Sequence, residues 1–400
     1  MNQNLNFQDS ELIKQIQNSD EPKWMKEKRL NALATFNSLP LPKLKYGIAI
    51  TLNSSEINLS EIQIPEKKQI NLPKYNNIIV ENLSTALKNH EELIKKHFMS
   101  CFPTLGKFES LHTMLWNKGL LIYVPRNTQV KEPIKLSDLN DNFEFQHNLI
   151  IVDENSSLSV YEEESSNNKV FSDSQKGSNY KTKITEIFVN NNSTLNYGNF
   201  QNLSQNTINV STKRALVNQN ANITWIDFCL GGKLTKSEIL TRLEKEGSST
   251  NVFSLFFSNN QQQFDFNSSI YHNAKHTKSN MAVRGVLDNK SKVIYNGLVK
   301  IAENASNSNG YQKQDALLLS SNAEIDPIPN LEIDNNDVKC SHGTTVSRID
   351  KDKLFYLKSR GLPEDKAVKL MIKGFFDPII RKIKIKQVRK DLRKAINSKL

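Results

Sequence analysis

The sequence predicts a mainly β protein, with a stack of short strands at its centre and helices at both ends. Three observations predict it. From about residue 105, apolar and polar residues alternate with the two-residue period of a strand. Within this stretch, an apolar pair, a polar turn and an alternating run recur, as at Ile151–Val152 and Leu216–Val217. No helical segments separate the copies and their turns are rich in Asn, which favours a β-helix or β-solenoid.

The spacing of the copies supports this architecture. Between consecutive anchor residues it is 37, 28, 26, 44 and 32 residues, the anchors being Val152, Val189, Val217, Leu243, Leu287 and Leu319. Periods of roughly 20 to 50 residues are typical of solenoids and arrays. The unequal spacing predicts turns of different lengths. Asn in these turns requires no ligand, because Asn tolerates left-handed backbone.

A small, mostly helical domain is predicted over residues 1–103. Pro22 fits the first turn of a helix that runs to about Ser38, where Pro40 and Pro42 end it. A further helix is predicted from Glu81 to Met99. We expect His90 and His97, on its apolar face, to be packing residues rather than ligands.

Helical periodicity returns after the β region, which is predicted to span residues 104–345. In residues 346–400 we expect a short helix from Lys353 to Arg360, stopped by Gly361. The next helix opens at Pro363, and Pro378 separates it from a last, basic helix. The apolar residues of the helix that opens at Pro363 follow amphipathic spacing: Val368, Met371, Ile372, Phe375 and Phe376. The helices at both ends of the chain are natural covers for the open ends of a solenoid.

Composition excludes several classes of protein. The net charge is +11, but residues 377–400 hold nine Lys/Arg and two Asp, a net of +7, so the remainder is near balance. It shows no basic surface interleaved with aromatic residues, and we expect no nucleic-acid binding. Phosphate-binding loops of the G-x-x-x-x-G-K and G-x-G-x-x-G types are absent. With no signal-peptide pattern and no apolar run of about 18 residues, we expect a cytoplasmic protein without a membrane span.

The three cysteines, Cys101, Cys229 and Cys340, form no C-x-x-C pair and no even framework, which favours a reducing compartment. They are too few for a complete cluster site of about four ligands within this chain. Cys340 and His342 lie two residues apart, so in a strand both point to one face. A thiol beside an imidazole is half of a soft-metal site. On the residues alone, a second interpretation stays open, in which Cys340 is a small buried hydrophobic residue and His342 is its hydrogen-bonded neighbour.

Three other candidate sites are expected to have no chemical role. His272 and His276 have no cysteine or carboxylate nearby in the sequence, and a structural role is favoured. The run of three carboxylates at residues 162–164 is expected to be a solvated rim. Gly231–Gly232 is expected to form a turn.

The segment Asp337–Gly343, DVKCSHG, followed by Leu354–Leu357 and Ser359–Gly361, resembles the signature of the SufD branch of the SufB/SufD family. These proteins are scaffold subunits of the Suf complex for iron–sulfur cluster assembly. Further stretches resemble the family in the same order along the chain: Leu39–Pro42, Gly119–Pro125, His272–Thr277 and Leu317–Ser320. The sequence departs from the family pattern at Lys275, where a proline is usual, and at Leu44 and Gly47, where Trp and Thr flank the shared Lys45–Tyr46.

The resemblance implies a right-handed parallel β-helix and a non-catalytic scaffold subunit of the SufBCD complex. It implies two partners: a SufB-like sister, joined end to end through the β-helix, and a SufC-like ABC-type ATPase, docked on the C-terminal helices. Met371, Phe375 and Phe376 would face the ATPase, while His342 and Cys340 would bind a transient iron–sulfur cluster at the SufB interface. No tightly bound cofactor is expected, and the isolated chain is expected to be able to form a homodimer.

Two alternatives from other classes are weighed against this reading. A β-helix polysaccharide-active enzyme would carry a signal peptide and a carboxylate cluster on one face. A structural or adhesive β-solenoid would lack the Cys/His pair and the helical C-terminal domain.

Overall fold

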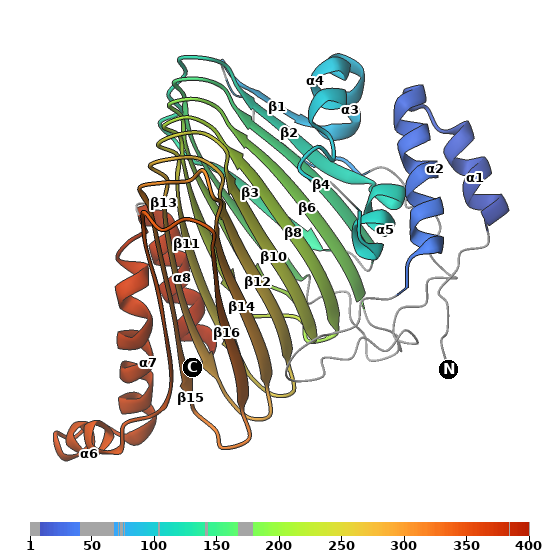
Figure 1. Ribbon diagram of the computed structural model, residues 1–400. Coiled ribbons are helices and arrows are strands. Elements are labelled where there is room, and N and C mark those ends of the chain that lie inside the picture. The colour runs from blue at the N-terminus through green and yellow to red at the C-terminus, as the bar shows by residue number, and fades with distance from the viewer. Residues whose placement is uncertain are drawn as a thin grey trace.

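The computed structural model describes residues 9–40, 68–70, 72, 75, 77–102, 105–140, 143–166, 179–383 and 385–399. It confirms the mainly β fold class: a parallel β-solenoid with helices near both ends of the chain (Figure 1). From β2 onward, successive strands alternate between two sheets, so each solenoid turn contributes one strand to each sheet. We call these sheets A and B.

All strand pairs within the two sheets are parallel except β1 with β2. Sheet A comprises β1 (Ile79–Asn82), β2 (Lys118–Val124), β4 (Phe143–Val152), β6 (Asn179–Val189), β8 (Thr207–Val217), β10 (Leu234–Leu243), β12 (Gln263–His272), β14 (Lys292–Ile301) and β16 (Glu324–Ile333). Sheet B comprises β3 (Ile134–Asn140), β5 (Ser157–Ser166), β7 (Thr194–Asn202), β9 (Asn222–Cys229), β11 (Ser249–Ser258), β13 (Lys278–Leu287), β15 (Ser308–Leu318) and β17 (Val338–Arg348).

The strand register confirms the first four anchors and corrects the last two. The ladder in sheet A runs through Val152, Val189, Val217, Leu243, His272, Ile301 and Ile333. Leu287 instead ends β13 in sheet B, opposite Leu318 of β15. The predicted spacing of 44 residues was therefore wrong, because it skipped a turn and changed sheets. The two-residue period looks the same in both sheets and cannot distinguish them.

One turn per repeat has a residue with left-handed backbone at the same place, and most of these residues are Asn, as predicted. In the turns that lead from sheet A to sheet B, the residues with positive φ are Asn127, Asn155, Asn192, Asn220, Gly247, His276 and Asn307. The first four form an amide ladder, with Nδ2 to Oδ1 distances of 3.0, 3.1 and 3.3 Å between successive turns. Side-chain amides therefore support the turns, and no ligand is needed to explain them.

The N-terminal helices cover the outer face of sheet A (Figure 1). They are α1 (Asp9–Asn18), α2 (Lys23–Ser38), α3 (Leu83–Asn89), α4 (Glu91–His97) and α5 (Lys107–Leu115). The single helix predicted from Glu81 to Met99 was wrong. Its first residues belong to β1, which extends sheet A, and His90 breaks the rest with φ −137° and ψ 41°. The predicted boundary at residues 103 and 104 lies outside the described residues.

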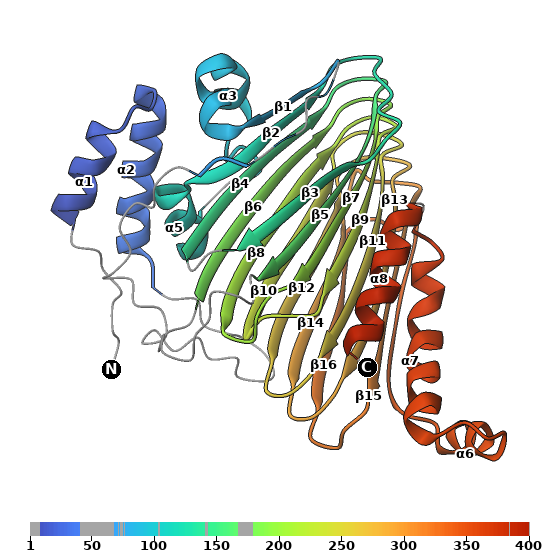
Figure 2. The same cartoon turned by 180° about the vertical axis from the view of Figure 1, so that it is seen from behind.

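The C-terminal helices α6 (Lys351–Ser359), α7 (Glu364–Ile380) and α8 (Lys386–Lys399) follow the last strand. Apolar residues of α7 and α8 pack on the outer face of sheet B (Figure 2). They therefore cover a face of the solenoid, and the expectation that they cover its open end was wrong. Pro378 lies inside α7 and does not separate two helices, because the following Ile379 and Ile380 continue the buried side of α7. Gly361 ends the preceding turn with φ +88°, as predicted.

Candidate functional site

The solenoid is open at the end formed by β16 and β17. Within the described residues, β16 pairs with β14 alone and β17 with β15 alone, so both outer edges lack a strand partner. The two strands have 10 and 11 residues, and most of their side chains are exposed or half-buried. Long unpaired edges are surfaces on which another chain adds strands. We call these two edges, with the side chains that point between them, the open end.

The large exposed apolar side chains of the described residues all lie between residues 311 and 370, on the last strands of the solenoid and the helices that follow them. Six large ones are exposed in the part of the chain that the structure describes: Tyr311, Ile333, Val346, Phe355, Tyr356 and Leu370. The first three belong to β15, β16 and β17, and the others to α6 and α7. Scattered exposed apolar residues are ordinary, but a concentration of them indicates an interaction surface.

Cys340 and His342 point to the same face of β17, as predicted. Their register partners on β15 are Gly310 and Gln312, both buried, so this face is directed toward the interior between the sheets. Cys340 is half-buried against an apolar layer that includes Val299, and burial raises the pKa of its thiol. His342 is exposed because no further turn stacks on it.

These two side chains do not make a complete metal site. Among the described residues, no group of three or more His, Cys, Asp or Glu side chains is placed to hold a metal ion. A four-coordinate site at Cys340 and His342 requires ligands from outside this chain. The unpaired edge beside them is where a second chain would bring such ligands.

Directly behind the open end lies a feature that the sequence analysis missed. Gln312 and Gln314 of β15 point inward and are almost completely buried, and Gly297 of β14 faces them from sheet A. Their alternation with the exposed Tyr311 and Lys313 was a readable signal, since it places both glutamines on the interior face.

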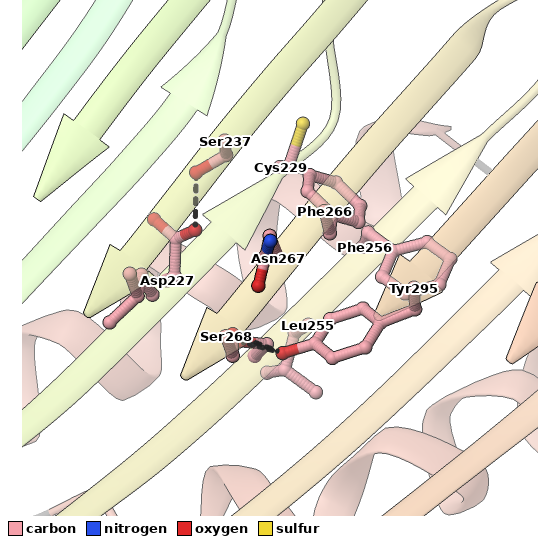
Figure 3. A pocket seen from close by; sticks show the side chains of 11 residues that line it. Asp227, Cys229, Ser237, Leu255, Phe256, Phe266, Asn267, Ser268 and Tyr295 are labelled. Atoms are coloured by element: carbon pink, nitrogen blue, oxygen red, sulfur yellow. Dashed lines mark hydrogen bonds between the residues drawn. The ribbon is translucent and has the colours of Figure 1, made fainter. Parts of the chain in front are cut away.

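Deeper in the solenoid, a small cavity of about 10 Å³ lies between the sheets (Figure 3). Aromatic rings of Phe256 and Phe266 line it, together with Tyr295, whose hydroxyl is 2.7 Å from Ser268 Oγ. Burial raises the pKa of Tyr295 to about 12. The cavity has room for about one water molecule, so it is part of the packed interior and not a substrate site.

The first turns of the solenoid enclose a cluster of buried charges. It alternates ammonium and carboxylate groups, from Lys118, Glu144, Glu162, Glu164, Lys181 and Lys183. The expectation of a solvated carboxylate rim was wrong for Glu162 and Glu164, which are 3% and 2% exposed. It holds for Glu163, whose side chain points out of the solenoid. The burial depends on a charged partner on β6, Lys183, which lies 21 and 19 residues away from Glu162 and Glu164 in the sequence.

The charges in this cluster stabilise one another. Burial alone would raise the pKa of Glu164, but the ammonium groups of Lys181 and Lys183 hold it well below its usual range. Burial alone would lower the pKa of Lys183, yet the Glu162 and Glu164 carboxylates raise it well above its usual value. Glu164 and Lys183 therefore stay ionised at neutral pH, which suits a structural role better than proton transfer.

The other histidine and glycine predictions are consistent with the structure. His272 is buried, with Nδ1 2.7 Å from Thr277 Oγ1 and Nε2 2.8 Å from Ser279 Oγ, and burial lowers its pKa to about 4. His276 occupies the left-handed position of its turn. His97 packs edge-on against Phe188, with ring centroids 4.6 Å apart. Gly232 has φ +95°, as a turn glycine does.

The C-terminal helices place the three predicted docking residues in different surroundings. Met371 and Phe375 are half-buried, and the Arg284 guanidinium lies 5.1 Å from the centre of the Phe375 ring. Phe376 is fully buried in the core between α7 and sheet B. An anchor for a partner must be reachable, so the expected role does not fit Phe376. The exposed Phe355, Tyr356 and Leu370 meet this requirement better, although the sequence analysis did not consider them as docking anchors.

The comparisons with known proteins agree with this picture. Residues 135–375 match the family model described as "SUF system FeS cluster assembly, SufBD core domain", and residues 53–136 match "SufBD protein N-terminal region". The chain is 28% identical to an iron–sulfur cluster assembly SufBD family protein of Staphylococcus haemolyticus, over 91% of this chain and 87% of the relative. It is 29% identical to a Staphylococcus aureus protein of the same description, over 93% and 89%. No helix among the described residues is both long and apolar enough to cross a bilayer.

Proposed function

The chain belongs to the SufBD family of iron–sulfur cluster assembly proteins, and we propose that it is the SufD-like, non-catalytic scaffold subunit of a SufBCD complex in the cytoplasm. The observation that carries this proposal is the open end, where an unpaired two-sheet edge presents His342 and Cys340 toward the space a second chain would occupy. Family membership does not fit the polysaccharide-active or structural solenoid alternatives.

We propose that a SufB-like sister chain joins at the open end and completes the site. Its strands would pair with β16 and β17, and Ile333 and Val346 would be buried in the joint. A thiolate of the sister chain would join His342 and Cys340 as ligands of the cluster iron, whose remaining positions are taken by the sulfide of the cluster itself. The cluster is the cargo of the complex. A neutral imidazole is a readily displaced ligand, which suits a site that must release its cluster. Two copies of this chain pairing through the same edges would give the homodimer expected for the isolated protein.

We propose that the SufC-like ATPase docks on the exposed side of α6 and α7. Phe355 and Tyr356 are 73% and 57% exposed and Leu370 is 50% exposed, with Met371 beside it. Apolar anchors on helices are typical of helix-in-groove docking. ATP hydrolysis would take place in that partner and not in this chain.

The cluster site is tested with His342→Ala in the complex co-expressed with both partners. The expected result is a complex of normal composition with strongly reduced iron and acid-labile sulfide after anaerobic purification. Ser341→Ala is the matched control, because Ser341 is an exposed neighbour on the opposite face of β17. Normal cluster content in His342→Ala, in an intact complex, would leave His342 as an ordinary interface residue.

The two docking surfaces are tested against each other. Phe355→Ala/Tyr356→Ala/Leu370→Ala should abolish co-purification of the ATPase and keep the sister chain, since each partner-facing anchor typically contributes more than about 1 kcal/mol. The reciprocal variant Ile333→Ala/Val346→Ala, at the open end, should lose the sister chain and keep the ATPase. Retention of the ATPase by the first variant at normal stoichiometry would contradict the docking proposal.

A further inference from the structure

Two buried amides at the open end have no hydrogen-bond partner. Gln312 and Gln314 are 0% and 4% exposed, and all four of their side-chain nitrogen and oxygen atoms lack a partner. A buried polar group left unpaired costs roughly 1–3 kcal/mol. Native proteins keep few such groups, so a pair of them on one strand indicates that something else completes their hydrogen bonds.

The surroundings of this amide pair are those of a built site. A Cβ added to Gly297 would lie 2.3 Å from Gln312 Nε2 and 2.6 Å from Gln314 Nε2. Both nitrogens therefore converge on the spot that the absent side chain leaves free. The preceding turn places Met281 and Val283 at the same two positions, so the amides do not continue a polar column from below.

The amide pair lies one rung behind the residues of the proposed cluster site. In the register of β15 and β17, Gln312 is opposite His342 and Gln314 is opposite Thr344. Adjacent strands are separated by about 4.8 Å. Gly310, opposite Cys340, keeps the thiol close to the same rung, since an added Cβ there would be 3.0 Å from Cys340 Sγ.

We propose that the side-chain N–H groups of Gln312 and Gln314 donate hydrogen bonds to the sulfur atoms of the cluster assembled at His342 and Cys340. This inference rests on the proposed function. Cluster sulfurs are negatively polarised acceptors, and hydrogen bonds to them stabilise a cluster and set its reduction potential. A primary amide supplies such bonds without a full charge, so it holds the cargo without the attraction that would hinder release. Both glutamines are positioning residues, because the metal ligands lie on the next strand.

The test replaces both amides by the residue types of the preceding turn, Gln312→Met/Gln314→Val. The apolar pair should leave the isolated chain at least as stable in urea, since unpaired amides are removed and similar volume is kept. The complex should still assemble. Its cluster should lose iron to a chelator about tenfold faster, the usual scale for loss of an outer-shell partner, and should have a more negative reduction potential.

A matched control separates the position from the chemistry. Gln262→Met also removes a buried glutamine, but one whose Nε2 already donates to Gly232 O at 2.8 Å, far from the open end. It should destabilise the chain and leave the cluster-release rate unchanged. If the double variant does not assemble, the single changes Gln312→Met and Gln314→Val make the same test, each with about a threefold faster release.

The outcomes distinguish this inference from the function on which it rests. A double variant with the wild-type release rate and potential, in a complex whose cluster depends on His342, would overturn the role of the amides alone. Normal cluster content in His342→Ala would overturn the site itself. A double variant that is less stable in isolation and unchanged in cluster release would show that the amides only fill the interior.

Discussion

Removing the ammonium group of Lys183 should destabilise this protein more than almost any surface change. Lys183 Nζ donates to Glu162, to Glu164 Oε1 at 2.8 Å and to Asn199 Oδ1 at 3.2 Å, and its side chain is 1% exposed. Glu164 would keep Lys181 at 2.8 Å. Glu162 would keep hydrogen bonds but would lose its counter-ion inside the solenoid.

The expected magnitude follows from that imbalance. Breaking a buried ion pair by removing one partner typically costs about 3–5 kcal/mol, because the remaining charge is uncompensated. Lys183→Met should therefore lower the free energy of unfolding of the isolated chain by about 3 kcal/mol or more, measured by urea unfolding. Adding Glu162→Gln should recover at least about half of the loss, since a neutral polar pair avoids the isolated charge. A loss below about 1 kcal/mol, or no recovery in the double variant, would refute the idea that charge balance holds these turns together.

Three further predictions concern single positions. Because burial lowers the pKa of His272 to about 4, the unfolded chain binds its proton first as pH falls, so this residue subtracts stability below its usual pKa near 6.5. Between pH 7 and pH 5, the free energy of unfolding of His272→Leu should therefore fall by about 2 kcal/mol less than that of the wild type, as measured by urea unfolding. An equal fall in both proteins would contradict this. Gly231→Ala should lower the melting temperature sharply, because the added Cβ would lie 2.1 Å from the Leu203 carbonyl oxygen. Gly374→Ala, in open space on α7, should instead raise the free energy of unfolding by about 0.5–1 kcal/mol. A similar change in stability in both variants would contradict this. Asn192→Ala, at φ +58°, should cost about 1–2 kcal/mol and Asn192→Gly clearly less, and the reverse order would argue against left-handed backbone as the reason for Asn in these turns.

Sequence periodicity was sufficient for the stack of strands but not for its register. Alternation gives the face of each residue, so the common face of Cys340 and His342 could be predicted. It does not say to which of two similar sheets a strand belongs, and the anchor at Leu287 was therefore misplaced. The shared turn geometry would have resolved this, since the left-handed residue at His276 marks the turn that was skipped.

Burial of polar residues was the weaker part of the sequence interpretation. Glu162 and Glu164 were expected at the surface because carboxylates usually are, but lysines of a neighbouring turn neutralise them inside. Phe376 was expected at the surface because its helix is amphipathic, yet amphipathic spacing shows only that one side is apolar. Whether that side packs on the same chain or on a partner depends on sheet B, which the helix reaches only in the folded structure.

The stacking of solenoid turns sets the order in which the protein folds. From β2 onward, each strand pairs with a strand only 26 to 37 residues away in the chain, as from Val217 to Leu243 or from Val152 to Val189. During synthesis, each turn can therefore dock on the one before it as it leaves the ribosome, and domains generally form from the N-terminus. The strand that carries His342 is the last rung, and α7 and α8 follow it. Both surfaces proposed for partners thus form after the other turns of the solenoid, so a nascent chain interrupted before β17 presents neither of them.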